Sequence, residues 1–224
     1  QLDIPQTALQ SYNQLAWFGS NANAYINIAD HGDFTFGDGS EDSAFTISAW
    51  INMNDASSFP VIGKFSSSHR EWLLKTGTTD KLYLKLYDNS ASVYITGMYD
   101  AALTSFEGQW LHVVATYDGS EHPNGMSIYI NGESKTLTVT DDASYVAMED
   151  KDAPVLIGAS AAESDYANGC ITEVSIWDTA FSAANVALLY NDGKAIDCLQ
   201  HPVYETYNPF LIAYWRNNGL ATWT

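Results

Sequence analysis

The chain has 224 residues, of which 46% are hydrophobic, so it is long enough to bury a sizeable core as a single all-β domain. It carries 27 acidic and 9 basic residues, and a net charge of −18 repels phosphate backbones and anionic membrane surfaces. No apolar run approaches the roughly 20 residues that a helix needs to span a bilayer. We therefore expect neither nucleic-acid binding nor membrane insertion.

The first half of the chain alternates polar and apolar residues with a period of two. In Phe45–Met53, an apolar residue occupies every second position, which predicts a strand with one face in a core. Similar short runs, bounded by turn residues, predict further strands. These strands are expected at Ala24–Ala29, Val61–Phe65, Arg70–Lys75, Lys81–Asp88 and Ser92–Tyr99.

The segment Trp110–Tyr117 is apolar on both faces apart from His112 and Thr116, which predicts a central strand covered on both sides. Met126–Ile130 follows and ends in an Asn-Gly pair, a strong signal for a hairpin. We expect Lys135–Thr140 to return from this turn as the second strand of the hairpin.

Later strands are expected at Pro154–Ser160, Gly169–Asp178 and Leu211–Arg216. One helix is predicted over residues 182–193, with Ser182 as its N-cap and Gly193 at its end. A total of about ten to twelve strands at this spacing indicates an all-β, two-sheet antiparallel sandwich of the jelly-roll type. We expect an N-terminal arm at 1–15, the sandwich at 16–196 and a C-terminal extension at 197–224.

Four segments, in this order, carry a resemblance to a known family. They are Ala44–Ile51, Gln109–Glu133, Pro154–Ser160 and Asn168–Gly193. Together they resemble the strands and short helix of concanavalin A-like, laminin G-like sandwich domains of the pentraxin type. The resemblance implies a domain that binds glycans or proteins, sometimes with calcium, in a secreted or surface protein or a phage virion.

The segment Leu211–Gly219 resembles a stretch that adjoins such domains in phage structural proteins, where it leads into a further module. We therefore expect a non-catalytic binding or structural module on a virion, as decoration, tail or fibre protein, or in another extracellular assembly. Its expected partners are structural proteins of the same assembly or surface glycans, and we expect a homo-oligomer. The alternative is a lectin domain, with or without calcium, and a lesser alternative is a glycoside hydrolase.

Catalytic patterns are lacking. Glycoside hydrolysis needs a pair of carboxylates, and the Glu-x-Asp-x-x-Glu string of sandwich glucanases does not occur here. A Gly-x-Ser-x-Gly nucleophile motif is also missing. His112 lies within the predicted central strand, where we interpret it as a hydrogen-bonded structural residue. The sequence therefore predicts a protein that is not an enzyme.

Two acidic loops contain the oxygen ligands that hard cations prefer, without the spacing of an EF-hand. Their acidic residues are Asp30, Asp33, Asp38 and Asp42 in one loop and Asp141, Asp142, Glu149, Asp150 and Asp152 in the other. In the resembling family, an Asp of the closing strand can serve a calcium site, and here the matching residue is Thr172. We predict no required cofactor and name no metal ligand. A bound calcium ion is the alternative that the sequence leaves open.

Aromatic residues on one strand face suggest a site for a partner. Tyr83, Lys85 and Tyr87 alternate with leucines in one strand, so they share a face. Trp72 and Tyr94 join them if the three strands are neighbours. Such rings can stack on the apolar face of a sugar, or instead pack against one another across the strands.

The chain contains two cysteines, Cys170 and Cys198. They either form one disulfide or remain two buried free thiols, and their spacing does not decide between the two.

Overall fold

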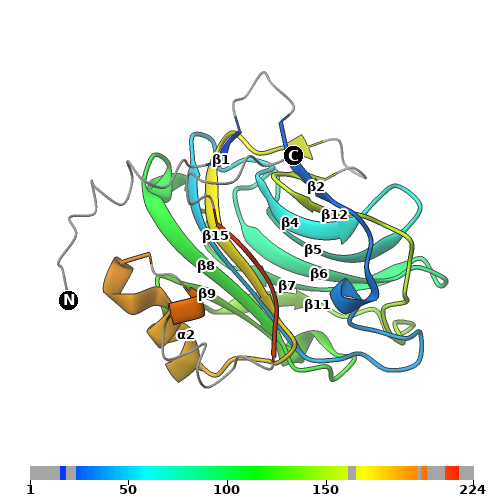
Figure 1. The fold of residues 1–224 in the computed structure, drawn as a ribbon. Coiled ribbons are helices and arrows are strands. Elements are labelled where there is room, and N and C mark those ends of the chain that lie inside the picture. Colours follow the sequence, from blue (N-terminus) through cyan, green and yellow to red (C-terminus); the bar gives the residue numbers. More distant parts are fainter. Residues whose placement is uncertain (1–15, 19–23, 161–164, 196–197, 201–209, 217–224) are drawn as a thin grey trace.

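The computed structural model describes residues 16–18, 24–160, 165–195, 198–200 and 210–216. Over these residues the chain forms two antiparallel sheets of seven strands each, which face one another, and a separate two-stranded ribbon. Figure 1 shows the two curved layers with the short helix α2 beside one of them. The two-sheet sandwich expected from the sequence is confirmed. Within the described residues, no helix has the length and apolar character to cross a membrane.

The first sheet, here sheet A, has the order β1-β15-β3-β8-β9-β10, with β16 also paired to β15. Its strands are β1 (Ala16–Phe18), β3 (Phe45–Met53), β8 (Trp110–Tyr117), β9 (Met126–Ile130), β10 (Glu133–Ser134), β15 (Gly169–Trp177) and β16 (Leu211–Trp215). All residues of β8 after the first are buried. The expectation of a central strand covered on both faces is therefore confirmed.

The second sheet, here sheet B, has the order β11-β7-β6-β5-β4-β12-β2. Its strands are β2 (Ile26–Ile28), β4 (Pro60–Phe65), β5 (Arg70–Thr76), β6 (Leu82–Asp88), β7 (Val93–Tyr99), β11 (Leu137–Thr140) and β12 (Val155–Ile157). The ribbon consists of β13 (Ala159–Ser160) and β14 (Asp165–Tyr166).

One hydrophobic core fills the space between the sheets. The alternating apolar positions of β3 and β6 all point into it, so both predicted face assignments are confirmed. These core residues are Phe45, Ile47, Ala49, Ile51 and Met53 from β3 and Leu82, Leu84 and Leu86 from β6. The other face of β6, with Tyr83, Lys85 and Tyr87, consequently points away from the core.

The expected hairpin is only partly right. Asn131 and Gly132 both have positive φ, as a tight type I′ hairpin turn requires, and they join β9 to β10. However, β10 ends at Ser134, and Leu137–Thr140 crosses to sheet B, where it pairs with β7. The return strand predicted at Lys135–Thr140 is therefore wrong as the partner of β9, and this segment links the two sheets instead.

The helix α2 (Ala183–Tyr190) covers the outer face of sheet A. The Oγ of Ser182 accepts a hydrogen bond from the backbone N–H of Asn185, which confirms the predicted N-cap. Buried apolar side chains between helix and sheet form a second cluster. Its members are Val114, Tyr129, Trp177, Phe181, Val186, Leu189 and Cys198.

The C-terminal strand β16 pairs with β15 and so completes one edge of sheet A. The boundaries expected for an N-terminal arm and a C-terminal extension stay predictions, because 1–15, 201–209 and 217–224 lie outside the described residues. Cys170 and Cys198 are both buried free thiols, so the structure contains no bond between them.

Candidate binding face

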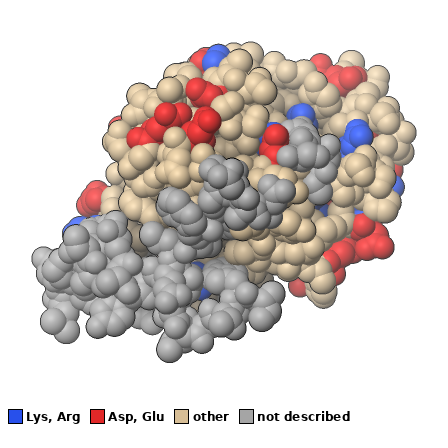
Figure 2. Space-filling view, turned by 90° about the horizontal axis from the view of Figure 1, so that it is seen from above, with Lys and Arg blue, Asp and Glu red and all other residues tan. Residues whose placement is uncertain are grey.

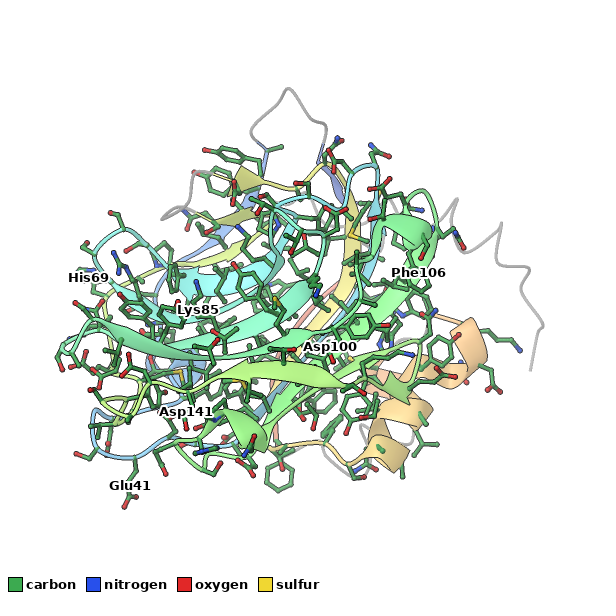
Figure 3. All side chains as sticks on the ribbon, turned by 180° about the vertical axis from the view of Figure 1, so that it is seen from behind. Glu41, His69, Lys85, Asp100, Phe106 and Asp141 are labelled. Atoms are coloured by element: carbon green, nitrogen blue, oxygen red, sulfur yellow. The ribbon has the colours of Figure 1, made fainter. Side chains whose placement is uncertain are left out.

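The outer face of sheet B carries a group of aromatic and basic side chains that we call the aromatic platform. It is made of Arg70 from β5, Tyr83, Lys85 and Tyr87 from β6, and Tyr94 from β7. The register places Tyr94 directly opposite Tyr87, so four of the five residues that the sequence suggested lie together. Figure 3 looks onto this face, with Lys85 labelled over the strands.

Contacts between rings and cations run through the platform without a break. The Nζ of Lys85 lies 4.8 Å from the ring centre of Tyr94 and 5.3 Å from that of Tyr83. The rings of Tyr87 and Tyr94 are stacked, with centres 6.0 Å apart. The guanidinium of Arg70 lies 4.8 Å from the ring centre of Tyr87 and donates a hydrogen bond to its hydroxyl. Each exposed cation–ring contact of this kind contributes about 0.5–1 kcal/mol.

Exposure divides the platform into a support and a contact surface. Tyr87 is only 8% exposed, because its ring packs on Phe65 and Leu73 in a small apolar cluster outside the main core. Tyr94 is 40% exposed, and Tyr83 and Lys85 are half-buried. Tyr87 therefore anchors the platform, while Tyr83, Lys85 and Tyr94 are accessible to a partner.

The charge of this face differs from that of the whole chain. The seven strands of sheet B contain only two carboxylates, Glu71 and Asp88, and both are buried. The same strands carry Arg70 and Lys85 on the outer face, together with Lys75, which is buried and paired with Asp165 of the ribbon. Figure 2 shows acidic side chains in patches on the surface seen from above, and Figure 3 places Glu41 and Asp141 at one end of the sandwich.

The expectation for Trp72 is wrong. Its side chain is fully buried in the main core, and its indole N–H donates a 2.8 Å hydrogen bond to the backbone carbonyl of Phe34. Leu73 and Leu74 are adjacent and both apolar, so the sequence alone did not show which face of β5 points inward. The structure places Leu74 in the main core and Leu73 on the outer face.

Arg70 is the platform residue that the sequence reasoning missed. The register between β4 and β5 shifts between the pairs Lys64–Trp72 and Phe65–Arg70, which is a bulge at Glu71. The bulge turns Arg70 to the outer face and leaves the carboxylate of Glu71 buried. The local sequence carries no signal for this bulge, so the outward position of Arg70 was not predicted.

In the acidic loops at one end of the sandwich, the carboxylate of Asp42 is hydrogen-bonded to other segments of the chain. The carboxylate of Asp42 accepts hydrogen bonds from the hydroxyls of Tyr117 and Tyr145 and from the backbone N–H of Met148, at 2.7–2.9 Å. Burial raises the pKa of Asp42 above its usual range. These three donors use its oxygens for structure, since they hold the segment after β11 against the strands.

Two further carboxylates are paired with the ammonium group of a buried lysine. The Nζ of Lys64 contacts the carboxylates of Glu71 and Asp30 and the backbone carbonyl of Lys151. Burial raises the pKa of Glu71 to about 7. Among the described residues, no group of three or more His, Cys, Asp or Glu side chains is arranged to hold a metal ion.

A small pocket lies on the other side of the molecule, lined by residues of sheet A, by Leu189 of α2 and by Cys198. Its volume of about 10 Å³ suits a single water molecule. The Nε2 of His112 lies 2.9 Å from the Oγ of Ser48, and burial lowers the pKa of His112 to about 3. The imidazole is therefore neutral and structural, as the sequence suggested, and Tyr190 stacks over it.

Comparisons with known proteins agree with this architecture. Residues 19–187 match the model of the concanavalin A-like lectin/glucanase superfamily. The chain is 24% identical to pappalysin-1 of Mus musculus over 151 residues, which is 61% of this chain and 9% of that protein. It therefore spans about a tenth of the length of this relative.

Two solved structures illustrate the likeness in fold. A putative carbohydrate binding protein from Bacteroides ovatus ATCC 8483 aligns with a TM-score of 0.56 and 19% identity, over 92% of this chain and 52% of that chain. The binding domain of Paraclostridial Mosquitocidal Protein 1 aligns with a TM-score of 0.57 and 17% identity, over 79% of this chain and 42% of that chain. At these identities the comparison establishes the fold.

Proposed function

Because the chain belongs to the concanavalin A-like lectin/glucanase superfamily, we propose that it is a non-catalytic binding module that holds an acidic glycan on the aromatic platform. The observation that carries this proposal is the combination of accessible tyrosine rings and cations on a sheet whose own carboxylates are buried. In a chain with a net charge of −18, such a face offers local charge complementarity to an anion.

Each platform residue has a distinct role in this proposal. The rings of Tyr83 and Tyr94 stack on the apolar face of a sugar, since aromatic side chains combine a flat apolar surface with a polar hydroxyl. The ammonium of Lys85, held between these two rings, pairs with a carboxylate or sulfate of the glycan. Tyr87 stacks on Tyr94 and keeps its ring in place, and Arg70 in turn holds Tyr87.

The setting that we propose is an extracellular surface, with a virion surface as its more specific form. The similarity of Leu211–Gly219 to phage structural proteins supports the virion setting. Repeated copies in a homo-oligomeric assembly would convert weak binding at each site into avidity. The proposal requires no cofactor, because both the stacking and the ion pair are made by side chains.

A glycan array with matched acidic and neutral glycans tests the proposed function, followed by titration calorimetry with the bound glycans. We expect Tyr94→Ala and Lys85→Met each to weaken acidic-glycan binding about tenfold, which corresponds to about 1.4 kcal/mol. Leu188→Ala, an exposed apolar position on α2, serves as the control and should bind like the wild type. A chelator should leave the affinity unchanged.

The proposal is wrong if no acidic glycan is retained, or if glycans bind with unchanged affinity to both platform variants. Loss of binding on chelation would instead support the calcium-dependent lectin alternative.

A further inference from the structure

A second pair of exposed aromatic side chains lies outside the platform. Tyr25 is 45% exposed and Tyr166 is 39% exposed, and their ring centres are 6.1 Å apart. Tyr25 directly precedes β2, whereas Tyr166 belongs to the ribbon strand β14. Two large side chains that remain this exposed while in contact with each other form a surface that nothing in the described fold covers.

This pair lies on the same outer face of sheet B as the platform. Ile26 packs against the main core, so the preceding residue, Tyr25, points to the opposite side of the sheet. The ribbon is fixed over this face by an ion pair between Asp165, next to Tyr166, and Lys75 of β5. Lys75 is in turn directly opposite Tyr83 of the platform.

Lys75 and the ribbon therefore lie between the two aromatic groups, and we call this part of the outer face the strip. Between Tyr25 at β2 and Tyr83 on β6 lie β12, β4 and β5. Four strand spacings at about 4.8 Å each separate the two tyrosines by roughly 19 Å. One sugar ring cannot contact both groups, whereas an extended oligosaccharide that crosses the strands can.

We infer that the ligand is an extended acidic glycan chain, and that Tyr25 and Tyr166 form a second subsite for sugars remote from those on the platform. This inference rests on the proposed function, since the platform holds the first sugars. The ion pair of Lys75 with Asp165 neutralises the middle of the strip, so the chain passes over it without repulsion. The second subsite on the ribbon therefore favours long glycan chains, and the platform favours acidic ones.

Titration with size-fractionated oligogalacturonates, from the dimer to the octamer, tests this inference. For the wild type, affinity should rise with length and level off once the oligomer spans both aromatic groups. Tyr25→Ala combined with Tyr166→Ala should bind the dimer normally and the octamer about threefold to tenfold more weakly. Tyr166→Phe keeps the ring and should retain the octamer affinity, and thermal melts of every variant verify that it is folded.

The outcomes separate the inference from the function on which it rests. If the oligomers bind and Tyr94→Ala weakens all of them, while the double variant binds the octamer like the wild type, the second subsite is refuted and the platform stands. An affinity that does not rise with oligomer length would likewise refute the second subsite and leave the platform standing. If the wild type binds neither dimer nor octamer, the acidic-glycan function fails, and the inference fails with it.

Discussion

The two sheets differ most in what lies on their outer faces. Sheet A is covered by α2 and by the segment around Cys198, and Trp177, Phe181 and the polar pair of Ser48 and His112 are buried there. Sheet B leaves Tyr94 and its neighbours accessible, with cations resting on their rings. The same strand pattern thus supports a layer whose outer face adds to stability and a layer whose outer face is available for recognition.

Truncation of Trp177 should give the largest effect and should affect stability alone. Its side chain is fully buried under α2, so Trp177→Ala should lower the free energy of unfolding by about 3–5 kcal/mol through the cavity and the lost burial. Tyr94→Ala, on the open face, should lower it by only about 1–2 kcal/mol, through the lost contacts with Lys85 and Tyr87. Urea unfolding of both variants measures the difference, and equal losses would contradict the division between the faces.

Lowered pH should also weaken sheet A through His112. Its pKa is about 3 in the folded protein and about 6.5 when unfolded, so the unfolded state binds more protons between these values. The contribution of His112 to stability is thus present above pH 6.5 and is lost as pH falls, by about 2 kcal/mol at pH 5. Asp42 and Glu71, with raised pKa values, act in the opposite direction.

Comparison with His112→Gln isolates the histidine from these carboxylates. The wild type should lose about 2 kcal/mol more than the variant between pH 7 and pH 5, measured by urea unfolding at each pH. Identical pH profiles for the two proteins would show that His112 is protonated without penalty, and so is not sealed beneath the covering segments.

A smaller effect should appear within the platform itself. A double-mutant cycle of Lys85→Met and Tyr94→Ala should give a coupling of about 0.5–1 kcal/mol in glycan binding, because the ammonium lies 4.8 Å from the ring centre. The same cycle with Lys85→Met and Leu188→Ala should be additive. Additivity in both cycles would mean that the two platform residues do not act together on the ligand.

The parts of this architecture that follow strict alternation could be predicted from the sequence. Phe45–Met53 and Lys81–Asp88 have one clear apolar face each, so their sides were assigned correctly, and Tyr83, Lys85 and Tyr87 with them. Trp110–Tyr117 was recognised because both of its faces are apolar. Tyr94 could be assigned to the same group because its strand was expected to be the neighbour of β6.

Other features depend on contacts between segments that are remote in sequence. A bulge at Glu71 turned Arg70 outward, and adjacent leucines hid the inward orientation of Trp72. The crossing of Leu137–Thr140 to sheet B competes with a hairpin that its local sequence equally permits. The second aromatic pair was missed because Tyr25 and Tyr166 are 141 positions apart and meet only through the ribbon.

The most direct test of the contrast between the two faces is amide chemical-shift mapping by NMR, with an acidic glycan titrated into the labelled protein. We expect shifts to concentrate on β6 and β7, around Tyr83, Lys85 and Tyr94, and to leave α2 and β8 unchanged. Shifts centred on α2 and β8, or on the acidic loops around Asp42, with sheet B unaffected, would contradict the assignment of recognition to sheet B.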